Sequence, residues 1–108
     1  MDTYSVIVTE FADNDLLLAE NFYELQAPNL GTYFFDTLIA DIESLSFYGG
    51  VHAKYFGLYR MLAKRFPYAI YYDIKDNTVV VYAVLDLRAN PLKNHQNILK
   101  QVGVIFNF

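Results

Sequence analysis

The hydrophobic pattern of the chain changes its period near the middle, and this change limits the folds that the chain can adopt. Between residues 10 and 45, apolar residues recur at the spacing of amphipathic helices. Between residues 58 and 87, they form three runs rich in β-branched and aromatic residues, separated by turn residues. Another β-type run, residues 4–9, precedes the helices. The order of one strand, two helices and three strands predicts a two-layer α+β domain.

The helical part divides at Ala27-Pro28-Asn29, because proline cannot continue helical hydrogen bonding. We expect helices at residues 10–26 and 30–45, joined as an antiparallel hairpin. The main apolar stripe of the first helix comprises Leu18, Phe22 and Leu25, with Phe11 at its start, and Ala12, Leu16, Ala19 and Tyr23 broaden it. The stripe of the second helix comprises Leu30, Phe34, Leu38, Ile42 and Leu45.

The three β-type runs, residues 58–64, 68–74 and 79–87, predict an antiparallel meander with a turn at residues 73–77. The period of 2 in the middle run separates a core face from an outward face. The core face comprises Tyr68, Ile70, Tyr72 and Ile74. We expect this face to pack on the helix hairpin and the opposite face of the sheet to point outward.

The segments around the meander carry weaker patterns. Residues 46–57, with three of the five glycines, predict a loop or a poorly formed strand entry. After Ala89-Asn90-Pro91 ends the sheet, residues 92–102 predict a short C-terminal helix that stops at Gly103. The last five residues, 104–108, form an apolar tail that packs on its own domain or on a partner.

Length and composition exclude several classes of protein. A chain of 108 residues favours one domain, spanning residues 1–108. The absence of cysteine excludes a disulfide scaffold, a zinc site with cysteine ligands and a thiol nucleophile. Because the N-terminus lacks a basic leader and no apolar run approaches the ~20 residues of a membrane helix, we expect a cytoplasmic protein without a membrane partner. We also expect no cofactor.

Charge is distributed unevenly between the two halves of the chain. Residues 1–53 contain no Lys or Arg, and their acidic residues are Asp2, Glu10, Asp13, Asp15, Glu20, Glu24, Asp36, Asp41 and Glu43. All basic residues lie in the second half: Lys54, Arg60, Lys64, Arg65, Lys75, Arg88, Lys93 and Lys100. Such asymmetry indicates a molecule with one face for an anionic partner, unless the charges are only solvated helix and strand ends.

Several segments together resemble the RelE/ParE toxin superfamily, which includes plasmid stabilisation proteins. Residues 59–72, "YRMLAKRFPYAIYY", are similar to the family's arginine-containing strand followed by Phe-Pro-Tyr and alternating Ile and Tyr. Residues 79–91, "VVVYAVLDLRANP", resemble its last core strand, and "VIVTEFA", "DLLLAENFYE" and "PNLGTYFFDTL" resemble its N-terminal half. The resemblance covers residues 4–91 and rests on the order and spacing of these segments.

The resemblance implies a toxin of a type II toxin–antitoxin system with a cognate antitoxin as partner. ParE-like members inhibit DNA gyrase, whereas RelE-like members cut mRNA on the ribosome. The long helix hairpin favours the ParE branch, so we expect binding rather than catalysis. The residues expected to contact the target or the antitoxin are Arg60, Lys64, Arg65, Tyr71, Arg88 and Lys93. An inactive relative that only binds an antitoxin is a third reading, which the overall acidity of the chain favours.

Ribonuclease activity would need a group that activates the 2′-hydroxyl and groups that neutralise the phosphate. The resemblance offers Arg60, Lys64 and Arg88 for the phosphate and His95 as an acid or base. Two departures weaken this reading. The second arginine of the RelE pattern is replaced by Ala69 or a near neighbour, and Asp86 stands where many members have histidine. At this spacing Asp86 is expected to pair with Arg88, which would hinder contact with a phosphate.

Other candidate sites have simpler explanations. His52 and His95 lack the spacing of metal ligands, so we expect ordinary loop or surface histidines. The acidic residues of the second helix, Asp36, Asp41 and Glu43, are expected on a solvated flank rather than around a metal. Stacking of nucleic acid bases on the tyrosines is conceivable, but packing in the sheet explains most of them: Tyr68, Tyr71, Tyr72 and Tyr82.

Overall fold

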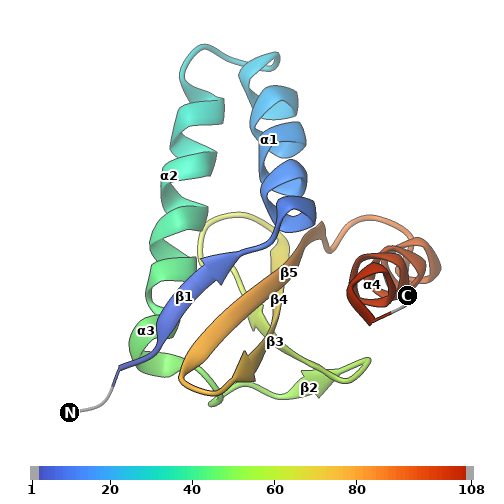
Figure 1. Cartoon of the computed structure of the whole chain (residues 1–108). Coiled ribbons are helices and arrows are strands. Elements are labelled where there is room, and N and C mark those ends of the chain that lie inside the picture. The colour runs from blue at the N-terminus through green and yellow to red at the C-terminus, as the bar shows by residue number, and fades with distance from the viewer. Residues whose placement is uncertain (1–2, 107–108) are drawn as a thin grey trace.

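The computed structural model describes residues 3–106, with side chains as far as Val102. Its elements in chain order are β1 (Ser5–Val8), α1 (Glu10–Glu24), α2 (Leu30–Glu43), α3 (Leu45–Tyr48), β2 (Lys54–Tyr55), β3 (Leu58–Leu62), β4 (Tyr68–Lys75), β5 (Thr78–Asp86) and α4 (Pro91–Phe106). The strands form one five-stranded sheet in the order β1-β5-β4-β3-β2. The α+β class and the order of elements are as the sequence predicts, and the helix hairpin and α4 flank the sheet (Figure 1).

The predicted meander of three antiparallel strands is confirmed as β3, β4 and β5. Strand β1 adds to it by pairing in parallel with β5, from Ser5 opposite Thr78 to Val8 opposite Val81. The turn between β4 and β5 has Asp76 at a φ of 56°, a left-handed conformation that Asp tolerates well. Residues 46–57, predicted as a loop or poor strand entry, also contain the end of α3 and the two-residue strand β2.

The α1–α2 hairpin is confirmed, and local sequence explains its ends. The Thr9 hydroxyl accepts a hydrogen bond from the Ala12 N–H at 3.2 Å and so caps α1. Asn29, with a φ of 69°, turns the chain into α2 after Pro28. The predicted stripe of α2 is also confirmed, because Phe34, Leu38 and Ile42 are buried in the main core against β4 and β5.

The main apolar stripe predicted for α1 is wrong. Leu18, Phe22 and Leu25 are 65%, 51% and 81% exposed, whereas the buried residues of α1 are Ala12, Leu16, Ala19 and Tyr23. Both series have helical spacing, so the period alone does not separate them. Tertiary packing decides, because the series with Ala12, Leu16, Ala19 and Tyr23 belongs to the main core. Gly31 of α2 lies close to α1, since an added Cβ would stand 2.5 Å from the Glu20 carbonyl oxygen.

The sheet face predicted to point outward is instead partly covered by α4. Ile98 of α4 is buried in a second core, whose other members include Leu58, Ala69, Tyr71, Tyr82 and Leu85. The helix also continues beyond Gly103, where it was predicted to stop, as far as Phe106. A glycine inside a helix costs only ~1 kcal/mol relative to alanine, so it does not by itself end a helix. Of the predicted apolar tail, residues 107–108 lie outside the described residues.

Two polar details also differ from expectation. Asp41 was predicted on a solvated flank, but it is only 7% exposed, and its carboxylate accepts a hydrogen bond from the Lys64 N–H at 3.0 Å. A buried carboxylate needs such a partner, and this bond ties α2 to the end of β3. No helix among residues 3–106 is long and apolar enough to cross a membrane.

Candidate functional site

Three of the predicted contact residues meet at one end of the sheet. The loop from β3 to β4, which carries Lys64 and Arg65, runs beside the end of β5, where the Leu87 N–H donates to the Pro67 carbonyl oxygen at 2.8 Å. Arg88 is the next residue after Leu87. Arg60 lies further back on β3, with its guanidinium 3.7 Å from the centre of the Tyr55 ring. The structure therefore brings Lys64, Arg65 and Arg88 to one end and leaves Arg60 near the β2 edge.

Arg88 is held by neighbouring side chains, as the sequence predicts. Its Nε and Nη2 donate to the two Asp86 carboxylate oxygens at 3.0 and 2.9 Å, and Nη2 also donates to the Tyr23 hydroxyl at 2.9 Å. Burial raises the pKa of Asp86, but the hydrogen bonds from Arg88 outweigh it and hold the pKa below its usual value. Arg88 is thus paired with a carboxylate, which offsets part of its positive charge toward a phosphate.

An aromatic cluster supports this end of the sheet. Phe66 lies 5.0 Å from Tyr23 and 4.9 Å from Phe34 between ring centroids. Tyr68 joins it from β4, and burial raises the pKa of its hydroxyl above the usual value. These rings fix the place of the Arg88 partner Tyr23. The cluster is therefore a packed support rather than an open platform for stacking bases.

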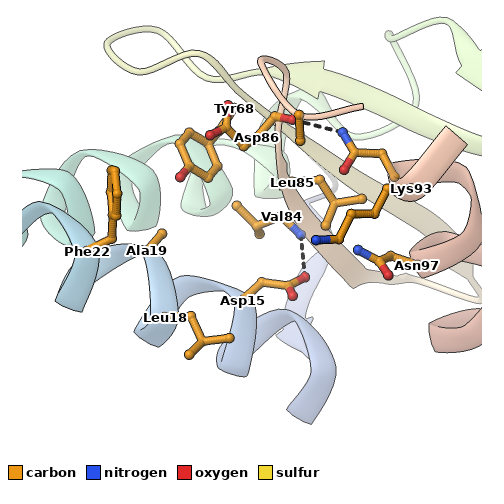
Figure 2. A pocket seen from close by; sticks show the side chains of 12 residues that line it. Asp15, Leu18, Ala19, Phe22, Tyr68, Val84, Leu85, Asp86, Lys93 and Asn97 are labelled. Carbon is orange, nitrogen blue, oxygen red and sulfur yellow. Dashed lines mark hydrogen bonds between the residues drawn. The ribbon is translucent and has the colours of Figure 1, made fainter. Parts of the chain in front are cut away.

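A groove runs between α1 and α4, with the end of β5 as its floor (Figure 2). It has a volume of about 310 Å³. The exposed Leu18 and Phe22 line the wall that α1 provides, and Lys93 and Asn97 line the wall that α4 provides. Lys93, one of the predicted contact residues, thus lies in a groove rather than beside Lys64 and Arg65.

Asp15 connects the three elements that form the groove. Its carboxylate accepts hydrogen bonds from the Val84 N–H at 3.0 Å and from the Gln101 side-chain amide at 3.3 Å. Burial raises the pKa of Asp15 to about 6, although both hydrogen bonds act to lower it. Sequence reasoning did not identify this residue. The sequence feature that could have identified Asp15 is its position on the helix, where a carboxylate stands between the apolar positions 11 and 18.

The two histidines lie in different places. The His95 ring stacks on Phe56, with centroids 4.2 Å apart. His52 forms a hydrogen bond through Nδ1 with the Tyr72 hydroxyl, and burial lowers its pKa. His95, a candidate acid or base, therefore stacks on Phe56, whereas Arg88 is bound to Asp86 and Tyr23. Among residues 3–106, no three His, Asp or Glu side chains gather in a way that could hold a metal ion.

The four tyrosines considered for base stacking are all buried. Tyr71, a predicted contact residue, is 3% exposed and belongs to the second core, and Tyr68, Tyr72 and Tyr82 are 6%, 0% and 2% exposed. Packing therefore accounts for all of them in this conformation.

Comparisons with known proteins identify the fold. No family model and no curated protein matches the sequence. A chain of the solved structure "Chromosomal ParDE TA system from P. aeruginosa" matches with a TM-score of 0.72 and 13% sequence identity. The match covers 80% of this chain and 98% of that chain. The protein therefore has the RelE/ParE-like fold that its sequence predicts, and it shares this fold with a chain of a ParDE toxin–antitoxin system.

Proposed function

We propose that the protein is the toxin of a type II toxin–antitoxin system, of the ParE-like kind. It acts by binding a macromolecular target, for which DNA gyrase is the first candidate, and a cognate antitoxin neutralises it. The observation that carries this proposal is the fold shared with a chain of a ParDE system, along 98% of that chain. The fold supports the class of protein, and the contacts of Arg88 and His95 support action by binding rather than by catalysis.

Binding rather than catalysis is supported by the surroundings of the candidate catalytic residues. Arg88 is engaged by Asp86 and Tyr23, and His95 is stacked on Phe56. A ribonuclease needs a base and a phosphate-neutralising cation converging on one atom. These two side chains have different neighbours, so the RelE-like endoribonuclease is the weaker candidate.

The antitoxin site that we propose is the groove between α1 and α4. Leu18 and Phe22 are large apolar side chains exposed beside a groove, which is unfavourable for an isolated surface helix and typical of an interface. An amphipathic antitoxin helix could bury both of them, and an acidic residue of that helix could pair with Lys93.

The target surface that we propose is the basic end and edge of the sheet, formed by Arg60, Lys64 and Arg65. Lys64 and Arg65 are exposed, and Arg60 is partly exposed over Tyr55. Exposed cations of this kind steer an acidic partner and raise its rate of association. Arg88 contributes to the same end when it is released from Asp86.

A DNA supercoiling assay with purified gyrase and the purified protein tests the proposed target. We expect inhibition by the unmodified protein and a rise of about tenfold in the inhibitory concentration for the double variant Lys64→Glu/Arg65→Glu. Lys100→Glu makes the same type of change on the exposed side of α4 and is the matched control. Full gyrase activity at saturating protein would refute the gyrase target.

Primer extension on mRNA from cells expressing the protein tests the alternative. We expect no new cleavage sites. Cuts between codon positions would replace the gyrase proposal with the endoribonuclease.

The antitoxin site has its own test. Phe22→Asp should abolish protection by the product of the adjoining reading frame, because it places a charge on the α1 wall of the groove. Leu17→Asp is the matched control, since Leu17 is 48% exposed on α1 but does not line the groove. Equal loss of protection in both variants would refute the site.

A further inference from the structure

A second hollow, with a volume of about 390 Å³, lies beside α4 and shares no lining residue with the groove between α1 and α4. Its lining comes from the turn between β2 and β3, from the strands β3, β4 and β5, and from residues 98–102 of α4. Sites for small molecules have volumes of roughly 300–1,000 Å³. The hollow is therefore large enough for a small organic ligand.

Most of the wall of this hollow is apolar. Leu58, Tyr82 and Ile98 are buried members of the second core, and Val102 packs against that core. Leu99, which also lines the hollow, is 57% exposed. Such a wall offers water few hydrogen-bond partners and offers an apolar ring many contacts. The body of a ligand that fits this wall is therefore a hydrocarbon ring or short chain.

Asp73 of β4 is the one charged residue among the described residues that line the hollow. It is half-buried, and its Oδ1 accepts a hydrogen bond from the Ile74 N–H at 2.8 Å. Because an ionised carboxylate can accept about four hydrogen bonds, Asp73 can accept more from a ligand. Lys75 lies two residues further along β4 and is not among the lining residues. The carboxylate therefore favours a ligand with a positively charged donor group.

The turn that forms one wall places an aromatic ring against the hollow. Phe56 and Gly57 link β2 to β3 and have φ angles of 55° and 83°, as a two-residue hairpin turn requires. Asn, Asp and Gly are the usual residues in such a turn, and a bulky residue with a positive φ is rare. The Phe56 ring also stacks on His95 of α4, with centroids 4.2 Å apart. The turn thus holds an aromatic wall in place although its own geometry favours other residues.

We propose that this hollow is a binding site for a small aromatic amine. The ring of the ligand packs between the buried side chains of the second core and Phe56, and its ammonium group donates hydrogen bonds to the Asp73 carboxylate. The faces of the Phe56 and Tyr82 rings add attraction for the cation. This inference does not rest on the proposed toxin activity, and it uses none of the residues assigned above to the target or the antitoxin.

The composition of the lining selects the amine over related ligands of the same shape. An anionic ligand would meet the like charge of Asp73, with no Lys, Arg or His side chain among the described lining residues to offset it. A neutral alcohol would fill the same space but would form a weaker hydrogen bond, because bonds between charged groups are stronger than neutral ones. The charge of the ligand is therefore the property that the experiment varies.

NMR spectroscopy of the full chain labelled with ¹⁵N tests the site with 2-phenylethylamine as the probe. We expect saturable shifts at Phe56, Asp73 and Tyr82 and a dissociation constant at least about tenfold lower than that of 2-phenylethanol. 3-Phenylpropanoate, the anion of similar shape, should bind more weakly than the alcohol. The absence of saturable shifts, equal binding of the amine and the alcohol, or shifts confined to the groove between α1 and α4 would overturn the proposal.

Variants separate the site from general attraction of a cation to an acidic protein. Asp73→Asn keeps an oxygen for the Ile74 N–H and should weaken binding of the amine about tenfold, while binding of the alcohol stays within about twofold. Asp76→Asn removes an exposed carboxylate from the neighbouring turn, where Asn tolerates the φ of 56°, and is the matched control. It should leave binding of the amine within about twofold.

A second variant keeps the test decisive if Asp73→Asn does not fold. Phe56→Gly suits the left-handed turn and removes the aromatic wall, so it should fold and bind the amine about fivefold more weakly or worse. Unchanged affinity for the amine in either folded variant, or an equal loss in Asp76→Asn, would overturn the proposal.

Discussion

Asp15 makes a sharp prediction about the pH dependence of stability. Its carboxylate is half-buried between α1, β5 and α4, and this burial raises its pKa from 3.8 to about 6. A group whose pKa is higher in the folded state stabilises the fold fully only below its unfolded pKa. That contribution is lost as the pH rises through 6, because the ionised form must remain buried. Asp15→Asn keeps an acceptor oxygen for the Val84 N–H but removes the charge.

The magnitude follows from the shift. At ~1.36 kcal/mol per pKa unit, the difference between 3.8 and about 6 corresponds to about 3 kcal/mol. Because the groove is partly open to water, we expect Asp15→Asn to raise the free energy of unfolding at pH 8 by about 1–3 kcal/mol. The curves of the two proteins should converge as the pH falls toward 3.8.

Urea denaturation measured between pH 3.5 and pH 8 tests this prediction. Asp36→Asn changes an exposed carboxylate of α2 and is the matched control, expected to stay within about 0.5 kcal/mol at every pH. A difference between Asp15→Asn and the unmodified protein that does not vary with pH would refute the reasoning. So would a variant that is less stable than the unmodified protein at pH 8.

Three further predictions concern other contacts. Arg88→Ala should raise the pKa of Asp86 in an NMR titration of its carboxyl carbon, because the side-chain hydrogen bonds that lower it are lost while the backbone bond remains, and an unchanged pKa would contradict the pair. Tyr72→Phe should lower the free energy of unfolding by about 1–2 kcal/mol, since the Gly50 N–H would lose its acceptor at 3.0 Å; no loss in urea denaturation would show that water replaces it. Phe34→Ala should cost about 3–5 kcal/mol in the same assay, because the ring is fully buried, and a loss under 1 kcal/mol would place Phe34 outside the core.

Much of the fold could be predicted because local pattern and tertiary structure agree over most of the chain. The stripe of α2 has one apolar series, so its period fixes the buried face. The runs that form β3, β4 and β5 are separated by turn residues, so their antiparallel order follows from their spacing. The Asp86–Arg88 pair could also be predicted from local sequence, since residues two positions apart in extended chain lie on the same side of it.

The errors arose where tertiary contacts choose between equal local patterns. α1 has two apolar series, and packing in the main core buries the one that contains Ala12 and Ala19. The cover of the sheet by α4 depends on Ile98 reaching a second core, which no local period reveals. Asp41 and Asp15 looked like solvated helix charges, yet each accepts a hydrogen bond from a backbone N–H outside its own helix. Their partners, Lys64 and Val84, lie far away in the sequence.

These errors also changed the candidate site. The exposed series of α1, predicted as core, lines the groove, and Tyr71, predicted as a contact, lies in the second core. The positions of Lys64, Arg65 and Arg88 at one end could be anticipated from the meander, because the loop after β3 and the end of β5 lie at the same end of antiparallel strands. The short length of β2, which pairs with β3 only at Leu58 and Tyr59, could not be anticipated, since no local pattern marks it.

Growth of bacteria after induction of the protein tests the central claim most directly. If the protein is a toxin, induction alone should arrest growth, and co-expression of the product of the adjoining reading frame should restore it. The Lys64→Glu/Arg65→Glu variant, expressed at the same level, should arrest growth less. Normal growth of cells that contain abundant folded protein, without any antitoxin, would contradict the account.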